Sequence, residues 1–384
     1  MAECTVPKTI IINAANLHGG GGVQVAISFL DELARLEVHR SGLTVLASDE
    51  VAEGLSELGV DVSVFRSFEV VNSYGPWRGF SVLREKLKRA DLAFTLFGPL
   101  YQIKKPNISI VGFAQPWIAY PDNEVYNKLS YFSAILNRIK FAVQKNVFKF
   151  SSDFIVVESE NIRDQLISLG VVKPSDISVV SNCISGIYQR SDVWRNVKMP
   201  VTPGRIRLGI VTRDYIHKNL DIIPAVKACL EKDYGIDSAF FVTFTESEWI
   251  KKSEEFKNAV FNIGVIRPEQ CPSFYQQIDA VFFPSLLECF SATPLEALAS
   301  KKPLFASNRP FVSEYCGNFP MYFDPNSPAD AARVIAEFVH KGISSERVES
   351  ACQHVRSLPG ARDRALAYLQ IVERLMAGKP GSTP

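Results

Sequence analysis

Two acidic residues lie eight positions apart in residues 284–299, which read PSLLECFSATPLEALA. Glu288 follows an apolar stretch that is typical of a buried strand, where a carboxylate needs a partner. Glu296 falls near the start of the helix expected next, which Pro294 would open and Thr293 would cap. Both carboxylates can accept hydrogen bonds from sugar hydroxyls. The helix dipole also favours an acidic residue in a first turn, so Glu296 alone does not require a ligand.

Two cations, Arg213 and Lys218, lie in the sequence VTRDYIHKNL, directly after another expected strand. In a loop that joins a strand to a helix, such a pair can hold a diphosphate and neutralise charge that develops on a leaving group. Because an Arg and a Lys in a loop are commonly solvated, this pair indicates a diphosphate site only in combination with the two glutamates.

Four glycines at positions 19–22 separate an expected strand from an expected helix. Gly20, Gly21 and Gly22 would let the backbone approach a phosphate at the N-terminus of that helix. Val25 breaks the G-x-G-x-x-G spacing and no G-K-[ST] follows, which argues against a dinucleotide fingerprint or a Walker loop. A flexible turn is the alternative. His18, just before the run, is either a structural contact or an acid or base.

Short apolar strands alternate with helices in two series, which predicts an α/β fold of two doubly wound domains with parallel sheets. The first series of strands is expected at residues 9–12, 43–47, 92–96, 108–113, 154–157 and 177–180. The second is expected at residues 206–211, 240–244, 260–262, 280–283 and 304–306. The predicted divisions are an N-terminal domain (1–187), a linker (188–204), a C-terminal domain (205–355) and a tail (356–384) whose helix packs back on the N-terminal domain.

Composition limits the class of protein. Hydrophobic residues make up 47% of the 384, and Lys plus Arg (42) balance Asp plus Glu (41). This balance argues against a disordered chain and against a protein that coats nucleic acid. Seven scattered cysteines without a C-x-x-C pair suit a reducing compartment. We see no secretory signal and no apolar run long enough to span a bilayer, and therefore expect a cytoplasmic protein, either free or bound to the inner membrane face.

Residues 284–299 resemble the hallmark of the retaining GT-B glycosyltransferases of family 4 (glycosyl transferases group 1), P-S-x-x-E-G-F-G-x-x-x-x-E-A-x-A. Other matching motifs follow in register from residue 10 to residue 340: the glycine run, 179–182, Arg213 and Lys218, 261–264, 273–280, 307–308 and 323–325. The resemblance implies two Rossmann-like domains that face each other across a cleft. It also implies transfer of a hexosyl or deoxyhexosyl group from a nucleotide-diphosphate sugar to a glycan, plausibly a surface polysaccharide or the O-antigen of lipopolysaccharide on a lipid carrier.

The resemblance also implies roles for individual residues. Arg213 and Lys218 would hold the donor diphosphate, Glu288 the transferred sugar and Glu296 the ribose. Further donor contacts are implied for the remaining matched positions, namely Gly20, Gly21, Gly22, Ile266, Phe290, Ser291 and Ala292. In this family the leaving phosphate is commonly taken to act as the base on the same face of the sugar, so no protein nucleophile is needed.

This sequence departs from the family pattern at three positions. Cys289 and Ser291 replace two glycines, and Gln115, in VGFAQPW, stands where many relatives carry a His. Gln can donate a hydrogen bond but cannot take up a proton at neutral pH. Gln115, His18 and Trp117 are the acceptor-side candidates. Because no D-x-D occurs, we expect no metal and no cofactor.

Residues 126–150 carry five basic residues and no acidic one. At ~100° per residue an expected helix here has one apolar stripe, formed by Leu129, Phe132, Leu136, Ile139, Val143, Val147 and Phe150. Arg138, Lys145 and Lys149 share another face. The sequence leaves two interpretations: a helix packed on its domain with a solvated basic side, or a surface for an anionic lipid or a lipid-linked acceptor.

Two other functions stay open at the level of sequence. A nucleotide-sugar epimerase of the same architecture would release a modified sugar without an acceptor. A catalytically silent subunit that binds a sugar nucleotide or a partner is compatible with the departures at Gln115, Cys289 and Ser291. An oxidoreductase is disfavoured because the glycine fingerprint is missing.

Overall fold

The computed structural model describes the whole chain except residues 1–7, 37–41, 76–79, 102–104 and 379–384. Cys4 lies outside the described residues. The chain forms two compact units, which are described separately below. The N-terminal unit consists of Met1–Pro121, Phe132–Cys183 and Pro359–Pro384, and the C-terminal unit of Asp122–Tyr131 and Ile184–Leu358.

These bounds differ from the divisions expected from sequence by a few residues at 187 and 355, which become 183 and 358, and more clearly in two other ways. Residues 188–204, expected as a linker, fall within the C-terminal unit. So does the short segment Asp122–Tyr131, although the strands before and after it belong to the N-terminal unit. Ion pairing explains its placement, because Glu124 in this segment pairs with Arg309 and accepts a hydrogen bond from Asn326.

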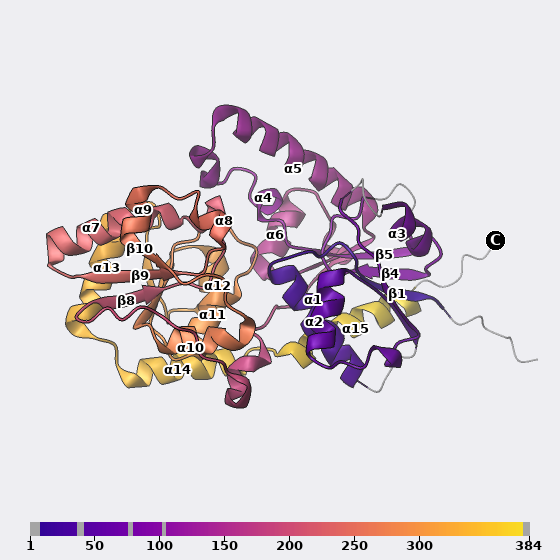
Figure 1. Cartoon of the computed structure of the whole chain (residues 1–384). Helices are drawn as coiled ribbons and strands as arrows, with labels where there is room; N and C mark the ends of the chain where they lie inside the picture. The colour runs from indigo at the N-terminus through magenta and orange to yellow at the C-terminus, as the bar shows by residue number, and fades with distance from the viewer. Residues whose placement is uncertain (1–7, 37–41, 76–79, 102–104, 379–384) are drawn as a thin grey trace, which may run out of the picture. The chain divides into compact units, whose positions relative to one another are not determined.

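The N-terminal unit contains a parallel sheet with the strand order β3-β2-β1-β4-β5-β6-β7. Its strands are β1 (Ile10–Ala14), β2 (Leu43–Ala47), β3 (Ser67–Val70), β4 (Leu92–Thr95), β5 (Ile108–Phe113), β6 (Phe154–Val157) and β7 (Ile177–Val179). Its helices are α1 (Gly21–Arg35), α2 (Asp49–Glu57), α3 (Phe80–Leu87), α4 (Pro116–Ala119), α5 (Tyr131–Ser151), α6 (Glu160–Ser168) and α15 (Ala361–Ala377). The C-terminal helix α15 thus returns to the unit in which the chain begins (Figure 1).

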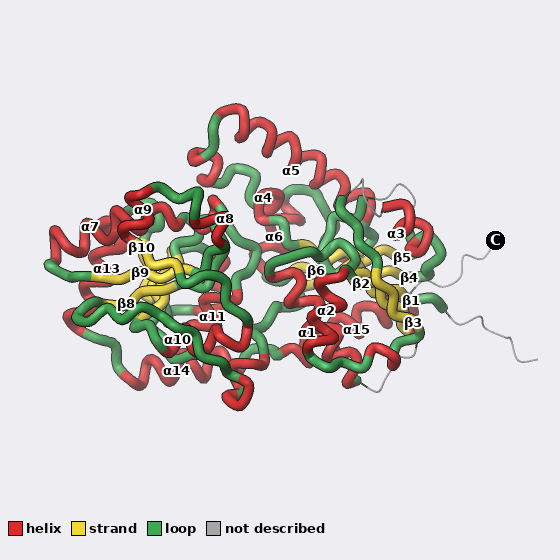
Figure 2. The backbone as a smooth tube through the Cα atoms, viewed as in Figure 1, coloured by secondary structure: helices red, strands yellow, loops and turns green. Residues whose placement is uncertain are grey.

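The C-terminal unit contains a second parallel sheet with the order β10-β9-β8-β11-β12-β13. Its strands are β8 (Ile206–Gly209), β9 (Ser238–Val242), β10 (Val260–Asn262), β11 (Ala280–Phe283), β12 (Leu304–Ser307) and β13 (Met321–Phe323). Its helices are α7 (Ile223–Tyr234), α8 (Glu246–Trp249), α9 (Glu254–Ala259), α10 (Cys271–Gln276), α11 (Ala292–Ala299), α12 (Pro310–Cys316), α13 (Pro328–Lys341) and α14 (Ser345–Ser357). Figure 2 shows each sheet enclosed by helices.

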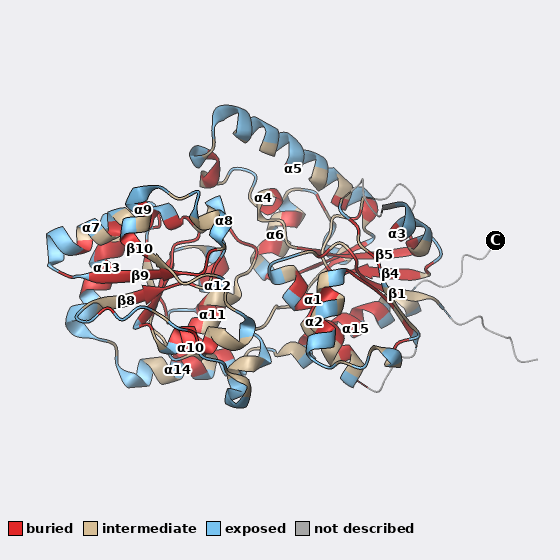
Figure 3. Ribbon diagram, viewed as in Figure 1, coloured by how far each residue is buried: buried red, intermediate tan, exposed pale blue. Residues whose placement is uncertain are grey.

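Burial follows the expectation for parallel sheets. β4, β5, β6, β9, β11 and β12 are buried at every position, because helices cover both faces of such a sheet. The buried residues concentrate on the strands and on the helix sides that face them (Figure 3). The predicted fold class is confirmed: the chain has two Rossmann-like α/β units with parallel sheets.

In each unit the strand order reverses direction beside the first strand of the sheet. β1 lies between β2 and β4, and β8 lies between β9 and β11. Where the order reverses, the loops at the carboxyl ends of two neighbouring strands diverge and leave space for a ligand. The loops after β1 and β4 in one unit, and after β8 and β11 in the other, are therefore the places to look for a site.

No helix among the described residues combines the length and the apolar character that a membrane span requires.

Candidate active site

The site in the C-terminal unit is built on the two loops at its strand-order reversal. β8 and β11 pair in parallel, with Leu208 opposite Ala280 and Gly209 opposite Val281. The loop after β8 carries Arg213 and Lys218, and the loop after β11 carries Glu288. Parallel pairing brings the carboxyl ends of both strands to the same edge, so these loops start side by side. A hydrogen bond from Leu286 N to the His217 carbonyl (2.8 Å) joins them.

Lys218 and Glu288 form an ion pair between the two loops. Lys218 Nζ lies 2.5 Å from Glu288 Oε1, and only 15% and 11% of the two side chains are exposed. The ammonium also lies 5.8 Å from the centre of the Phe283 ring. A buried carboxylate after an apolar strand needs such a partner. The sequence predicted that Glu288 has a partner, and the structure identifies it as Lys218.

The backbone around Lys218 is held in an unusual conformation. Asn219, the next residue, has a φ of 57° and donates a hydrogen bond from Nδ2 to the Pro325 carbonyl (2.8 Å). Asn tolerates the left-handed region better than most residues. Burial lowers the pKa of the neighbouring His217 to about 4, an effect that the positive charge of Lys218 reinforces and the carboxylate of Glu288 opposes. His217 is therefore neutral at physiological pH.

Arg213 has a different partner. Its Nε lies 3.0 Å from both carboxylate oxygens of Glu248, and 46% of its side chain is exposed. Burial would raise the pKa of Glu248, but hydrogen bonds from Thr245, Arg213 and the Asp214 N–H outweigh burial and lower it. Glu248 was not among the residues predicted from the sequence. The capping pattern Thr245-x-x-Glu248 at the start of α8 was the available signal.

Glu296 lies inside α11, and its carboxylate faces two tyrosines. Tyr275 donates a hydrogen bond to Glu296 Oε2 at 2.9 Å, and Tyr188 is the second hydroxyl neighbour. Burial raises the pKa of Glu296, and the tyrosine hydroxyls act in the opposite direction. Helix α11 begins at Ala292 rather than Pro294, and its N-cap is Ser291, so the predicted cap at Thr293 was wrong.

The N-terminus of α11 lies at the end of the Glu288 loop. No side chain caps it, and its first turn carries no acidic residue. The first N–H groups of a helix have no partner within the helix and attract anions. Phe290 packs edge-on against Tyr315, with ring centres 4.9 Å apart, and Cys289 is buried. The amides of Ser291 and Ala292 therefore follow a loop whose side chains are fixed by packing.

Ile266 follows the turn after β10 and packs partly buried against the hydrophobic core of the C-terminal unit. In that turn Gly264 has a φ of 78°. Asn262 Oδ1 accepts hydrogen bonds from the N–H groups of Phe244 (2.9 Å) and Gly264 (3.2 Å). The turn is thus tied to the strand end at β9, while its tip at Val265 is exposed.

The glycine run occupies the corresponding reversal point of the N-terminal sheet. Helix α1 starts at Gly21, and its N-cap Gly20 has φ 68° and ψ −157°, a conformation that other residues rarely adopt. A Cβ at Gly19, Gly20 or Gly21 would meet no atom within 4 Å, whereas at Gly22 it would touch Leu17 and Phe97. The run therefore borders open space.

Both ring nitrogens of His18 are engaged. Nδ1 lies 2.9 Å from Glu50 Oε2, and Nε2 lies 3.0 Å from the Ser73 carbonyl oxygen. The ring also stacks on Tyr74 at 3.9 Å. The pKa of Glu50 is lowered by hydrogen bonds, first to the backbone and then to His18. These contacts give His18 a structural role whether or not it meets a substrate.

Gln115 and Trp117 lie at the start of α4. The Gln115 carbonyl accepts hydrogen bonds from the N–H groups of Ile118 (3.0 Å) and Ala119 (3.2 Å). The Trp117 ring stacks on Phe141 of α5, with ring centres 5.5 Å apart and planes 2° from parallel. Trp117 thus connects the loop after β5 to α5.

The structure brings together two of the residues predicted from sequence, Lys218 and Glu288, in direct contact. Arg213 pairs instead with Glu248, and Glu296 with Tyr275. The roles that the sequence analysis assigned to these residues stay predictions. In the described part of the chain, no group of three or more His, Cys, Asp and Glu side chains could hold a metal ion.

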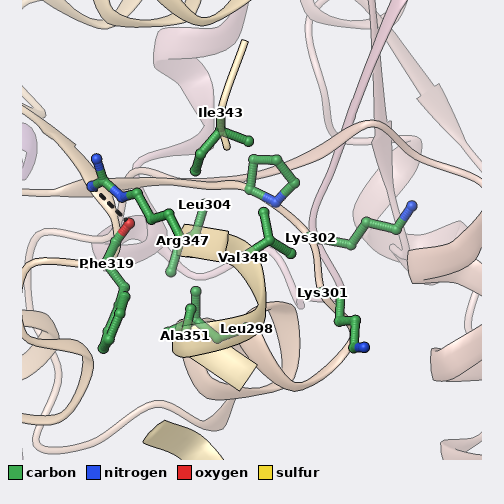
Figure 4. A pocket seen from close by; sticks show the side chains of 10 residues that line it. Leu298, Lys301, Lys302, Leu304, Phe319, Ile343, Arg347, Val348 and Ala351 are labelled. Atoms are coloured by element: carbon green, nitrogen blue, oxygen red, sulfur yellow. Dashed lines mark hydrogen bonds between the residues drawn. The ribbon is translucent and has the colours of Figure 1, made fainter. Parts of the chain in front are cut away.

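Two cavities occur in the C-terminal unit away from the Lys218–Glu288 pair. The first is lined by Leu298, Lys302, Arg347, Val348 and other residues, and its volume of about 10 Å³ admits no more than one water molecule (Figure 4). It lies beside Pro303, at the amino end of β12, whereas ligands of such sheets bind at the carboxyl ends. The second is a hollow of about 490 Å³ lined by Tyr188, Gln189, Ser191, Trp194 and Arg356.

Comparison with known proteins agrees with the fold described above. Residues 244–354 match the model of the family described as glycosyl transferases group 1. No curated protein matches the chain by sequence. A glycosyltransferase from Rickettsia africae has a similar structure, with a TM-score of 0.66 and 13% identity over 97% of this chain and 100% of that one.

Two further solved structures are similar over nearly their whole lengths. HepE from Anabaena, in complex with UDP-glucose, has a TM-score of 0.65 and 14% identity over 96% of this chain and 99% of that one. The sucrose-phosphate synthase of Thermosynechococcus elongatus has a TM-score of 0.66 and 13% identity over 97% and 100%. The chain thus has the GT-B glycosyltransferase fold. More particularly, residues 244–354, which contain Glu248, Glu288 and Glu296, carry the sequence signature of glycosyl transferases group 1.

Proposed function

We propose that this chain is a retaining, metal-independent glycosyltransferase. It moves a hexosyl or deoxyhexosyl unit from a nucleotide-diphosphate sugar to a glycan acceptor, in the synthesis of a bacterial surface polysaccharide such as the O-antigen of lipopolysaccharide. The observation that supports this most is the Lys218–Glu288 pair, buried at the strand-order reversal of the unit that carries the family signature. A cytoplasmic location accords with the free state of the cysteines among the described residues.

In this proposal the donor's diphosphate takes over the interaction that Lys218 now makes with Glu288. The ammonium then stabilises negative charge on the leaving phosphate. Glu288, released from the pair, accepts hydrogen bonds from hydroxyls of the transferred sugar. Arg213 adds a second cation from the same loop, which requires that a phosphate compete with Glu248 for its guanidinium.

The bond changes need no protein nucleophile. The bond between the anomeric carbon and the diphosphate breaks while an acceptor hydroxyl attacks from the same face, and the acceptor's proton passes to a phosphate oxygen. The N–H groups at Ser291 and Ala292, at a helix start that no side chain caps, suit a sugar or phosphate oxygen, and the Glu296 carboxylate suits the ribose hydroxyls. Ile266 borders the base, the glycines at 20–22 the donor phosphates, and His18, Gln115 and Trp117 the acceptor.

The test combines binding and turnover. Calorimetry with UDP, GDP, TDP and ADP identifies the donor base, beginning with UDP because HepE was crystallised with UDP-glucose. Lys218→Met and Arg213→Met should each weaken nucleotide binding by about tenfold or more, because each removes a charge-assisted contact. Glu288→Gln should leave nucleotide affinity within about twofold and reduce turnover about a hundredfold, because its contact is to the sugar.

Arg205→Met is a matched control for Arg213→Met. Arg205 precedes β8, pairs with Asp237 at 2.9 Å and is similarly exposed, but it lies at the opposite edge of the sheet. It should bind nucleotide as the wild type does. Equal losses in both Arg variants would contradict the proposed site. Release of a modified free sugar without acceptor would identify an epimerase, and binding without turnover on any donor–acceptor pair a silent subunit.

A further inference from the structure

Helix α5 is attached to the N-terminal unit by one side. Phe148 is fully buried, with its ring centre 4.9 Å from that of Phe113. Phe141 stacks on Trp117, as described above. Phe141 and Phe148 are seven residues apart and therefore point in the same direction. These two residues define the inner side of α5.

The opposite side of α5 is apolar and exposed. It is formed by five residues, which we name the outer stripe: Phe132, Leu136, Ile139, Val143 and Phe150. Their exposed fractions are 78%, 68%, 57%, 56% and 74%, respectively. Figure 3 shows α5 exposed along most of its length. The sequence-based interpretation of α5 as a helix simply packed on its domain is therefore wrong for this stripe, because packing uses Phe141 and Phe148.

Basic residues lie on both flanks of α5, between the outer stripe and the inner side, and we call these flanks the basic borders. At ~100° per residue, Lys140 lies on one flank, with its ammonium 5.1 Å from the centre of the Phe141 ring. Arg138, Lys145 and Lys149 lie on the other flank. Arg138 also donates to the Pro121 carbonyl at 3.5 Å. The helix carries no Asp or Glu. An exposed apolar stripe between cations, without any anion, complements a surface that is apolar inside and negatively charged at its boundary.

We propose that α5 lies in the surface of an anionic lipid bilayer, with the outer stripe among the acyl chains and its basic borders at the lipid phosphates. Apolar burial and attraction to anionic lipids then act together, as stable attachment of a helix to one face of a bilayer requires. The inner side keeps the rest of the N-terminal unit on the membrane surface. The proposal stands on α5 alone and does not depend on the proposed transferase activity.

A second copy of this chain fits the outer stripe less well. A stripe on one helix of this length is ~30 Å long and ~10 Å wide, well below the roughly 800 Å² per partner of a stable dimer. Two copies joined through it would also bring their basic borders together without an acidic residue on either helix, which is repulsive.

Vesicle cosedimentation tests the proposal without donor or acceptor, so its outcome is separate from that of the transferase tests. The full chain should bind vesicles of equimolar phosphatidylglycerol and phosphatidylcholine, and bind pure phosphatidylcholine far more weakly. The triple variant Lys140→Glu, Lys145→Glu, Lys149→Glu should lose about a hundredfold in affinity, or about fivefold for each position. The variant Leu136→Gln, Ile139→Gln, Val143→Gln should lose at least about tenfold.

The matched control reverses three exposed lysines in the C-terminal unit: Lys232→Glu, Lys251→Glu, Lys341→Glu. It has the same net charge as the first variant and should bind as the wild type does. Leu136→Trp gives a second measurement, since its fluorescence should shift to the blue when anionic vesicles are added. An unshifted emission, wild-type binding by either α5 variant, or a solution dimer that the Gln variant dissociates would overturn the proposal.

Discussion

Glu296, the residue proposed to bind the ribose, lies where burial disfavours a charged carboxylate. Its side chain is partly buried, and its carboxylate accepts a hydrogen bond from Tyr275 at 2.9 Å. Burial raises its pKa above 4.5, the value expected for an unfolded chain. Its contribution to stability is therefore largest below pH 4.5 and declines as the pH rises through the folded-state pKa. Above that pKa, the folded chain carries an unfavourable charge that a neutral side chain would avoid.

Glu296→Gln should accordingly be more stable than the wild type at pH 8, and the difference should vanish below pH 4.5. The same variant should bind the nucleotide about fivefold more weakly at pH 8, because a charge-assisted hydrogen bond to the ribose becomes a neutral one. Thermal unfolding across pH, and calorimetry with the best nucleotide, measure the two effects. The control variant Glu231→Gln, at an exposed position, should show neither the gain in stability nor the loss of nucleotide affinity. A destabilised Glu296→Gln would show that the charge is compensated by its surroundings.

For single residues, the sequence indicated candidate site residues better than it indicated the contacts that they make. The Glu288 carboxylate was expected to need a partner, and the expected donor ligand Lys218 supplies it. Glu248 was missed because it lies thirty-five residues from Arg213 along the chain, and only the fold brings them together. Tyr188 and Tyr275 were missed for the same reason, because only the fold brings them to Glu296.

Among the helices, α1 depends on the glycine at its N-cap, Gly20. At φ 68° and ψ −157°, Gly20 occupies a region that is essentially restricted to glycine. Gly20→Ala should destabilise the N-terminal unit by about 1–3 kcal/mol through backbone strain alone, since a Cβ there meets no atom. Gly21→Ala is the matched control: it lies in the helix with open space around it and should stabilise the unit by up to about 1 kcal/mol.

Urea unfolding of the two variants, followed in the N-terminal unit, should thus give shifts of opposite sign. If both variants were destabilised equally, steric contact rather than backbone conformation would be the cause. Nucleotide binding adds a second readout. A loss of affinity in Gly21→Ala without a loss of stability would support the proposed approach of donor phosphates to this loop.

Strands with a mainly apolar sequence were predictable to the residue, as β2, β5, β6, β10 and β11 demonstrate. β3 was missed because its sequence, SFEV, is only partly buried and contains a charge. The case of α5 is different. Its apolar stripe was visible in the sequence, but periodicity cannot tell a stripe that packs on protein from one that faces outward. Phe141 and Phe148, which decide the matter, lie outside that stripe.

At the scale of the whole molecule, the chain ends in the unit where it begins. Helix α15 packs on α1 and β4. Its buried residue Arg364 donates hydrogen bonds to Asn182 and to Ser28 Oγ, the latter at 3.0 Å. Asn182 in turn donates to Glu158 Oε1 at 2.7 Å. Asn182, in the family-like segment 179–182, is thus connected to the last helix. The N-terminal unit is therefore complete only after the entire C-terminal unit has been synthesised.

This topology makes a buried side chain on α15 a stability determinant of strands near the start of the chain. Tyr368 is 4% exposed, and its ring meets those of Phe29 and Phe94 edge-on at 5.1 and 5.0 Å. Tyr368→Ala should destabilise the N-terminal unit by about 3–5 kcal/mol, whereas Leu366→Ala, on the exposed side of the same helix, should cost less than about 1 kcal/mol. Hydrogen exchange should accelerate in β1 and β4 of Tyr368→Ala and stay unchanged in β8 and β11. Equal acceleration in all four strands would mean that the two units unfold as one, and that α15 stabilises the whole chain rather than the unit on which it packs.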